Sequence, residues 1–184
     1  MSKRYVLCLT AADRPGILAA VATALAELGG DIAEINHAVV TNYFAIILAA
    51  DFPDERKPQV ILAHLEGVCR PFGVELIMKD PDRESHTGAI TGKTARFVLS
   101  TSGQDAPGIV ARITGCLARE GVDITHLRGT RRDGSKSFEL VFELAVPVTV
   151  DGAALQNEIG QVATSLGIAA RLERAAEALA GGTL

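Results

Sequence analysis

The chain has 184 residues, of which 48% are hydrophobic and 22% charged, and its formal net charge at pH 7 is −4. This composition is typical of a globular protein, and the acidic balance argues against direct nucleic-acid binding. The apolar runs are too short to span a membrane, and the N-terminus does not read as a signal peptide, so no membrane contact is expected. Three cysteines without metal-binding or disulfide spacing indicate a reducing, cytoplasmic location.

The first 80 residues begin with a strand-like pattern and a helical one. A β-rich run covers residues 5–10, and Pro15 then stands where helices accept proline, in the first turn. The apolar residues of this helix recur at helical spacing. They are Ile17, Val21, Leu25 and Leu28. We expect the glycine pair at 29–30 to end the helix.

A hairpin and a second helix complete this segment. Residues 32–40 and 43–50 read as two strands joined by a two-residue turn. Residues 58–72 place their apolar side chains on one helical face, and Gly73 is expected to end this helix. A last strand is predicted over residues 74–78.

Residues 81–94 are polar, rich in turn formers and without periodicity, and are expected to form a linker. Within them, the stretch from Gly88 to Thr94 (GAITGKT) resembles a phosphate-binding loop but is one residue short of that motif. It also follows a polar segment and precedes a strand, whereas a phosphate-binding loop follows a strand and opens a helix. Nucleotide binding is therefore not expected.

The rest of the chain repeats the first part. Residues 13–32 align with residues 105–124 at an offset of 92 without a gap, and half of the aligned positions are identical. A two-residue insertion near 131–134 then changes the offset to 94. The repeat predicts strands at 96–101, 123–131, 137–145 and 168–173, and helices at 107–120 and 151–166.

Both copies have the element order β-α-β-β-α-β, which is typical of ferredoxin-like folds. We expect an α+β protein with two such domains in tandem, each an antiparallel sheet with its helices on one face. The expected organisation is a first domain over residues 1–80 (copy one), the linker, a second domain over residues 95–175 (copy two) and a C-terminal tail over residues 176–184.

The third strand differs between the copies. In copy two, Glu139 and Glu143 mark a solvated face of the sheet. The same face in copy one carries Ala45, Ile47 and Ala49. An apolar face of this kind is expected to be covered by the other copy or by a second chain, unless alanines are simply tolerated there.

No constellation of side chains indicates catalysis. The four histidines occupy non-equivalent positions in the two copies and lack metal-ligand spacing: His37, His64, His86 and His126. No serine or cysteine stands in a nucleophile elbow. We therefore expect a protein that is not an enzyme, with no catalytic residues, no metal site and no cofactor.

The junction between first strand and first helix carries D-x-P-G-I in both copies, followed by an apolar helix and G-x-D-I. This combination resembles the ACT domain. Two such domains with little else resemble the tandem ACT-domain family of the glycine cleavage system transcriptional repressor.

The resemblance implies a non-catalytic regulatory protein that binds a small amino acid, with glycine or serine as first guess. It implies action on a protein partner, a transcription factor or an enzyme, in the regulation of amino-acid metabolism. A homodimer or an intramolecular pairing of the domains is expected with it. The alternatives are an interaction or scaffold protein without a ligand and a regulatory subunit of a metabolic enzyme.

The junction residues themselves suit a free amino acid. A helix N-terminus offers unpaired N–H groups to the carboxylate, and Gly16 lets a ligand approach the backbone. Acidic side chains accept from the ammonium, and the resemblance implies contacts from the Asp13 and Asp31 positions. The alternative is structural, with Asp13 capping the helix and Gly16 turning the chain. The candidate ligand-binding residues are Asp13, Arg14, Pro15, Gly16, Ile17, Leu18, Asp31 and Asn36 in copy one, and Asp105, Pro107, Gly108, Ile109, Val110 and Asp123 in copy two.

The copies differ at two of these places. Arg14 and Asn36 exist only in copy one, which is therefore expected to be the better site. Copy two instead has Arg128, Arg131 and Arg132 near its hairpin. These arginines form either a basic surface for an acidic partner or an ordinary solvated turn.

Overall fold

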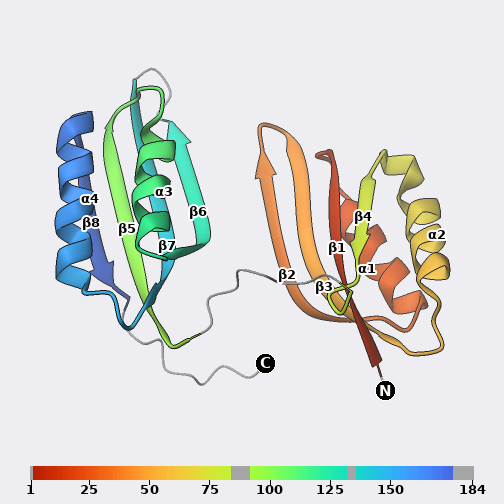
Figure 1. Cartoon of the computed structure of the whole chain (residues 1–184). Helices are drawn as coiled ribbons and strands as arrows, with labels where there is room; N and C mark the ends of the chain where they lie inside the picture. The colour runs from red at the N-terminus through yellow and green to blue at the C-terminus, as the bar shows by residue number, and fades with distance from the viewer. Residues whose placement is uncertain (1, 84–91, 132–135, 176–184) are drawn as a thin grey trace. The chain divides into compact units, whose positions relative to one another are not determined.

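The computed structural model describes residues 2–83, 92–131 and 136–175 (Figure 1). The chain divides into two compact units, with the division between Thr87 and Gly88. Three of the segments considered above lie wholly or partly outside the described residues. The first is residues 84–91 of the expected linker, which include His86 and the start of the phosphate-loop-like stretch. The second is residues 132–135 at the insertion, which include Arg132. The third is the tail from residue 176.

Copy one is a four-stranded antiparallel sheet with two helices. Its strands are β1 (Ser2–Ala12), β2 (Asp31–Val40), β3 (Tyr43–Pro53) and β4 (Glu75–Lys79), in the sheet order β2-β3-β1-β4. The helices are α1 (Ile17–Glu27) and α2 (Pro58–Cys69). Every neighbouring pair of strands is antiparallel, so β2 runs parallel to β1 and β4 parallel to β3, and α1 and α2 each carry the chain back to the opposite end of the sheet.

Copy two repeats this topology. Its strands are β5 (Thr94–Gln104), β6 (Asp123–Arg131), β7 (Ser137–Pro147) and β8 (Ile168–Arg174), in the order β6-β7-β5-β8. The helices are α3 (Ile109–Arg119) and α4 (Gly152–Leu166). The expected α+β fold with two ferredoxin-like domains is confirmed.

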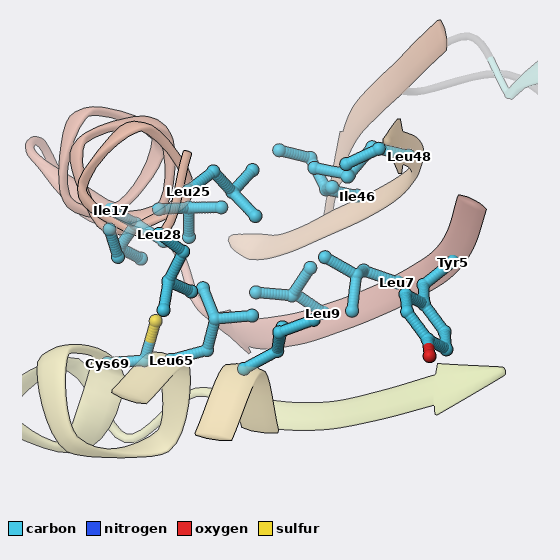
Figure 2. Packing of buried hydrophobic residues seen from close by; sticks show 14 of the residues in the cluster. Tyr5, Leu7, Leu9, Ile17, Leu25, Leu28, Ile46, Leu48, Leu65 and Cys69 are labelled. Carbon is cyan, nitrogen blue, oxygen red and sulfur yellow. The ribbon is translucent and has the colours of Figure 1, made fainter. Parts of the chain in front are cut away.

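Each copy has its own core between the sheet and the helices. In copy one, Leu7 and Leu9 of β1 and Leu48 of β3 meet Leu25 of α1 and Leu65 of α2, all fully buried (Figure 2). The core side chains alternate along each strand because successive residues of a strand point to opposite faces. Copy two builds an equivalent core on residues such as Leu99, Phe142 and Ile159. No helix in the described part of the chain is both long and apolar enough to cross a membrane.

Helix boundaries differ from the sequence prediction in two ways, and the first also applies to copy two, where α3 begins at Ile109 after the left-handed Gly108 rather than at residue 107. Pro15 lies before the first helix rather than in its first turn, because Gly16 has a φ of 98° and is not helical. The second helix ends at Cys69, and residues Arg70–Phe72 form a short 3₁₀ turn, η1. Pro71 explains this end, since proline has no N–H for a helical hydrogen bond and restricts the residue before it.

Candidate functional site

The loop between first strand and first helix has the same backbone in both copies. Gly16 has a φ of 98° and Gly108 a φ of 88°, in the left-handed region that favours glycine. Each glycine is the residue directly before its helix, and neither α1 nor α3 has a side-chain hydrogen bond at its N-terminal cap. The structure therefore does not support the alternative in which Asp13 caps α1. Both helices instead begin with N–H groups that can donate hydrogen bonds to a ligand carboxylate.

A main-chain hydrogen bond anchors this loop to the hairpin in both copies. The N–H of Asp13 donates to the carbonyl oxygen of Asn42 at 2.7 Å, and the N–H of Asp105 donates to that of Lys136 at 2.5 Å. Asn42 and Lys136 are equivalent residues, each directly before the third strand of its copy. The acidic residue of the motif thus has a fixed backbone position at the end of the sheet.

In copy one, the junction is lined by an aromatic side chain. The ring of Phe72 lies 3.6 Å from the position that a β-carbon on Gly16 would take. Arg14 donates to the carbonyl oxygen of Pro71 at 2.8 Å, and its guanidinium lies 5.2 Å from the centroid of the Phe72 ring. Arg14 is therefore engaged by η1 of its own domain.

In copy two, the junction opens into a hollow of about 490 Å³. The loop and helix side is formed by residues such as Asp105, Gly108 and Val110, and the sheet side by Phe138 and Leu140 of β7. No described atom lies within 4 Å of the position that a β-carbon on Gly108 would take. The hollow therefore brings together four of the predicted candidates, Asp105, Gly108, Ile109 and Val110, and adds two β7 residues that sequence reasoning did not select.

An ion pair stands at this hollow. The guanidinium of Arg131, on β6, donates to the carboxylate of Asp105. Arg131 was noted in the sequence only as part of a basic hairpin. The register of β6 against β7 pairs Arg131 with Phe138, which lines the hollow, and this pairing brings the arginine to the junction.

The difference between the two junctions follows from one position, which lies just after the second helix in copy one and inside the second helix in copy two. Pro71 of copy one is equivalent to Ser165 of copy two, and Phe72 to Leu166. Without a proline, α4 continues as a regular helix to Leu166. In copy one, the proline replaces the last helical turn with η1, and this turn carries Phe72 to Gly16.

Three predicted residues lie away from the junction. In the register of copy one, Asp31 stands opposite Asp51, which is opposite Arg4 at the far end of β1. That end is eight residues from Ala12, or about 25 Å along an extended strand. Asp123 occupies the same far end in copy two, since it pairs through Ala145 with Arg96. Asn36 pairs with Ile47 in the middle of the sheet.

These positions correct one expectation. Within one copy, Asp13 and Asp31 cannot both accept from the ammonium of the same amino acid, and neither can Asp105 and Asp123. The cause is the chain path: the first helix runs back along the sheet, so the second strand starts at the end opposite the junction.

The face of the sheet away from the helices differs between the copies. Across the middle of copy one, the register aligns Asn36, Ile47, Cys8 and Ile77, and both isoleucine side chains are more than half exposed. The equivalent row of copy two is Arg128, Val141, Ser100 and Arg171. The apolar open face inferred for copy one is therefore present within its own domain, whereas copy two carries charges there.

The titratable groups of the described residues do not form a metal site. No group of three or more His, Cys, Asp or Glu side chains among them lies close enough together to hold a metal ion. Cys69 and Cys116 are buried in the cores, and burial raises the pKa of both thiols. A raised pKa lowers the fraction of reactive thiolate, so these cysteines act as packing residues.

Residues 5–70 and residues 95–173 each match a family model described as the ACT domain. A UPF0237 protein of Corynebacterium diphtheriae is 41% identical over 49 residues, which are 27% of this chain and 55% of that protein. A UPF0237 protein of Methanocaldococcus jannaschii is 30% identical over 80 residues, which are 43% of this chain and 89% of that protein. The match thus spans about half the length of the first relative and most of the second.

Two solved structures have the same fold over nearly the whole chain. A protein of unknown function from Galdieria sulphuraria aligns with a TM-score of 0.80 at 20% identity, over 96% of this chain and 100% of its own. A candidate glycine cleavage system transcriptional repressor aligns with a TM-score of 0.71 at 17% identity, over 94% of this chain and 97% of its own.

Proposed function

Because the chain belongs to the ACT-domain family, with two such domains in tandem and UPF0237 proteins among its relatives, we propose that it is a regulatory protein that senses a free amino acid. The observation that carries this proposal is the junction in copy two. There, an uncapped helix N-terminus, a left-handed glycine and an acidic side chain surround a hollow of about 490 Å³.

The junction offers a partner to each polar group of an amino acid. The first N–H groups of the helix and its positive dipole end suit the carboxylate. The acidic residue, Asp13 in copy one and Asp105 in copy two, suits the ammonium. The remaining motif residues, Pro15 and Gly16 or Pro107 and Gly108, set the loop and keep it free of bulky side chains.

Glycine and serine remain the first ligands to test. The family resemblance favours them, and a protein described as a candidate glycine cleavage system transcriptional repressor shares the fold at 17% identity. The crowding of Gly16 by Phe72 also favours a ligand with little or no side chain in copy one.

Regulation requires that the ligand change a contact of the protein. A ligand shifts an equilibrium only by binding one arrangement more tightly than another. The open face of copy one supplies a surface for such an arrangement, because Ile47 and its neighbours Ala45 and Ala49 are apolar. We infer that this face packs on the other domain or on a second copy, and that a cytoplasmic partner protein, a transcription factor or an enzyme, reads the result without direct nucleic-acid contact.

One observation favours a second candidate, an interaction or scaffold protein without a ligand. Arg14 is bound to Pro71 and Phe72, and Asp105 is paired with Arg131. Side chains engaged in this way are also what a junction without a ligand would have. The protein would then act as a regulatory subunit or scaffold whose contacts with its partner do not depend on a ligand.

A thermal-shift screen of the twenty proteinogenic amino acids on the full chain separates the two candidates. A ligand at a hundred times its dissociation constant stabilises the folded state by about 2.7 kcal/mol. We expect a rise in melting temperature with a small number of amino acids. No rise with any of them, for a protein whose circular dichroism shows it to be folded, would leave the scaffold candidate.

A further inference from the structure

We propose that the hollow of copy two selects amino acids with an apolar side chain, of the size of valine, leucine or isoleucine. This inference rests on the proposed function and narrows the class of ligand for one of the two junctions. It differs from the expectation of glycine or serine, which rests on resemblance and which we retain for copy one.

The lining of the hollow is mostly apolar. Asp105 is the charged member of the lining, and the rest consists of apolar side chains, alanines and a glycine. Ile109 and Val110 face the hollow from α3, and Phe138 and Leu140 face it from β7. Val110 is 43% exposed, which is much for an apolar residue at the start of a helix. An apolar side chain placed between these two walls removes apolar surface from water on both sides.

The hollow is large enough for an amino-acid side chain. Its volume of about 490 Å³ lies in the range of roughly 300–1,000 Å³ that small-molecule sites occupy. Glycine has no side chain and would leave the apolar walls in contact with water. Each methylene that the walls bury improves affinity by about fourfold. A branched aliphatic side chain therefore gains well over tenfold on glycine, even when part of it stays exposed.

The ion pair beside the hollow suits the charges of a free amino acid. Asp105 and Arg131 place opposite charges side by side on separate elements, the loop before α3 and strand β6. A zwitterionic amino acid carries the complementary pair of charges. Its ammonium suits Asp105, and its carboxylate suits the planar guanidinium of Arg131, which binds carboxylates with two parallel hydrogen bonds.

Copy one has neither feature in the same form. The residue equivalent to Arg131 is Val39, which carries no charge, and the ring of Phe72 stands at Gly16. The apolar selectivity is therefore assigned to copy two alone.

Calorimetric titration of the full chain with glycine, serine, valine and leucine tests the proposal. The variants are Val110→Asp and its matched control Leu18→Asp. These residues are equivalent, each is the second residue of its helix, and each is 43% exposed. An acidic residue there is favourable to the helix dipole, so both variants should fold. We expect leucine to bind, Val110→Asp to weaken leucine binding by at least about tenfold while glycine binding stays unchanged, and Leu18→Asp to leave leucine binding unchanged.

The outcomes are distinct. If glycine or serine binds and leucine does not, or if Val110→Asp leaves leucine binding unchanged, the selectivity is wrong while the proposed function stands. If no amino acid binds, the proposed function itself fails. If Leu18→Asp weakens leucine binding as strongly as Val110→Asp does, the assignment to copy two is overturned. Arg131→Gln is the second variant, with no change to the hollow's apolar wall. This variant should weaken leucine binding by about tenfold, and an unchanged leucine affinity would contradict the role given to the ion pair.

Discussion

The guanidinium of Arg14 lies over the ring of Phe72, 5.2 Å from its centroid, and donates to the carbonyl oxygen of the preceding residue, Pro71. Arg14 is the charged side chain that distinguishes the junction of copy one from that of copy two, where alanine stands in its place. This contact holds the loop against η1, so the guanidinium of Arg14 is bound within its own domain and is not directed toward a ligand. The two junctions thus have the same backbone and different surroundings.

Substitution of the two junction carboxylates should separate the sites. The sequence differences predict copy one as the better site for a small amino acid, and the hollow assigns an apolar one to copy two. We therefore expect Asp13→Ala to weaken the binding of glycine or serine and Asp105→Ala to weaken the binding of leucine, each by about tenfold or more. The reason is that a hydrogen bond to a charged group is worth about 1.5–3 kcal/mol. Calorimetric titration of both variants with both ligands measures this. Equal losses for every ligand in both variants would indicate one site shared between domains.

The open face of copy one should be needed for assembly. Ile47 is 52% exposed on this face, and an aspartate there would be tolerated by an isolated domain while preventing apolar packing. We expect Ile47→Asp to reduce the mass in solution or the cooperativity of unfolding, measured by light scattering and by urea titration. Val141→Asp, at the equivalent place of the charged face of copy two, is the comparison. If Ile47→Asp leaves mass, stability and ligand affinity unchanged, the face is merely exposed and the mechanism proposed for it is wrong.

The stability of copy one should depend on pH at both ends of the scale. Hydrogen bonds from Arg4 and from Lys3 hold the pKa of Asp51 and that of Asp80 below the usual value. A lowered carboxyl pKa stabilises the fold above the unfolded value, about 3.9, and this contribution is lost as pH falls through the folded value. Conversely, hydrogen bonds to Asp80 and then Asp82 raise the pKa of Lys3 to about 12. Its contribution is complete below about pH 10.4 and is lost as pH rises through 12.

Urea unfolding of the full chain between pH 7 and pH 2.5 checks the acid side. We expect the free energy of unfolding of copy one to decrease below about pH 4, and to decrease less in the double variant Asp51→Asn, Asp80→Asn. Such variants are also expected to be less stable at pH 7, because they lose charged hydrogen bonds. An identical pH dependence of variant and natural protein would show that the two carboxyls are not the groups responsible.

Two glycines of copy two should respond oppositely to alanine. A β-carbon on Gly103 would lie 2.8 Å from Cγ2 and 3.1 Å from Cα of Ile168, so β5 and β8 would have to separate, at a cost of about 1–3 kcal/mol. Gly115 lies within α3 and has no described atom within 4 Å of the equivalent position. Gly115→Ala should therefore stabilise by about 0.5–1 kcal/mol through helix propensity. Thermal unfolding of both variants measures the two signs, and a destabilised Gly115→Ala would contradict the open space seen there.

Much of the fold could be predicted from the sequence, because periodicity and the repeat act locally. The alternation in β7 identifies a strand, and the helical spacing from Ile17 to Leu28 identifies a helix. The repeat then shows each of these elements a second time in the other copy. The errors lie at residues whose conformation depends on a neighbour. Pro15 resembles an N-terminal helix proline until the left-handed Gly16 is known, and the break at Pro71 was masked by the apolar face that continues to Phe72.

The site could be predicted only in part. The motif identified the junction, because a glycine and an acidic residue a few positions apart indicate a loop that leads into a helix. The position of Asp31 at the far end of the sheet follows from the path of α1, and the hollow of copy two follows from where Leu166 and Phe138 are placed by distant elements. The position of Asp31 and the shape of the hollow both depend on packing between segments far apart in sequence. Neither feature produces a pattern within a short stretch of sequence.

The hydrogen bonds from Asp13 to Asn42 and from Asp105 to Lys136 run from main chain to main chain. No side chain at either end is needed to keep the loop in place. Asn42 has a φ of 64°, in the left-handed region, so the backbone limits which residues fit at that place, and the side chain has changed from an uncharged amide to a cation between the copies. The two copies can thus differ in charge beside the loop while the main-chain hydrogen bond that holds the loop stays the same.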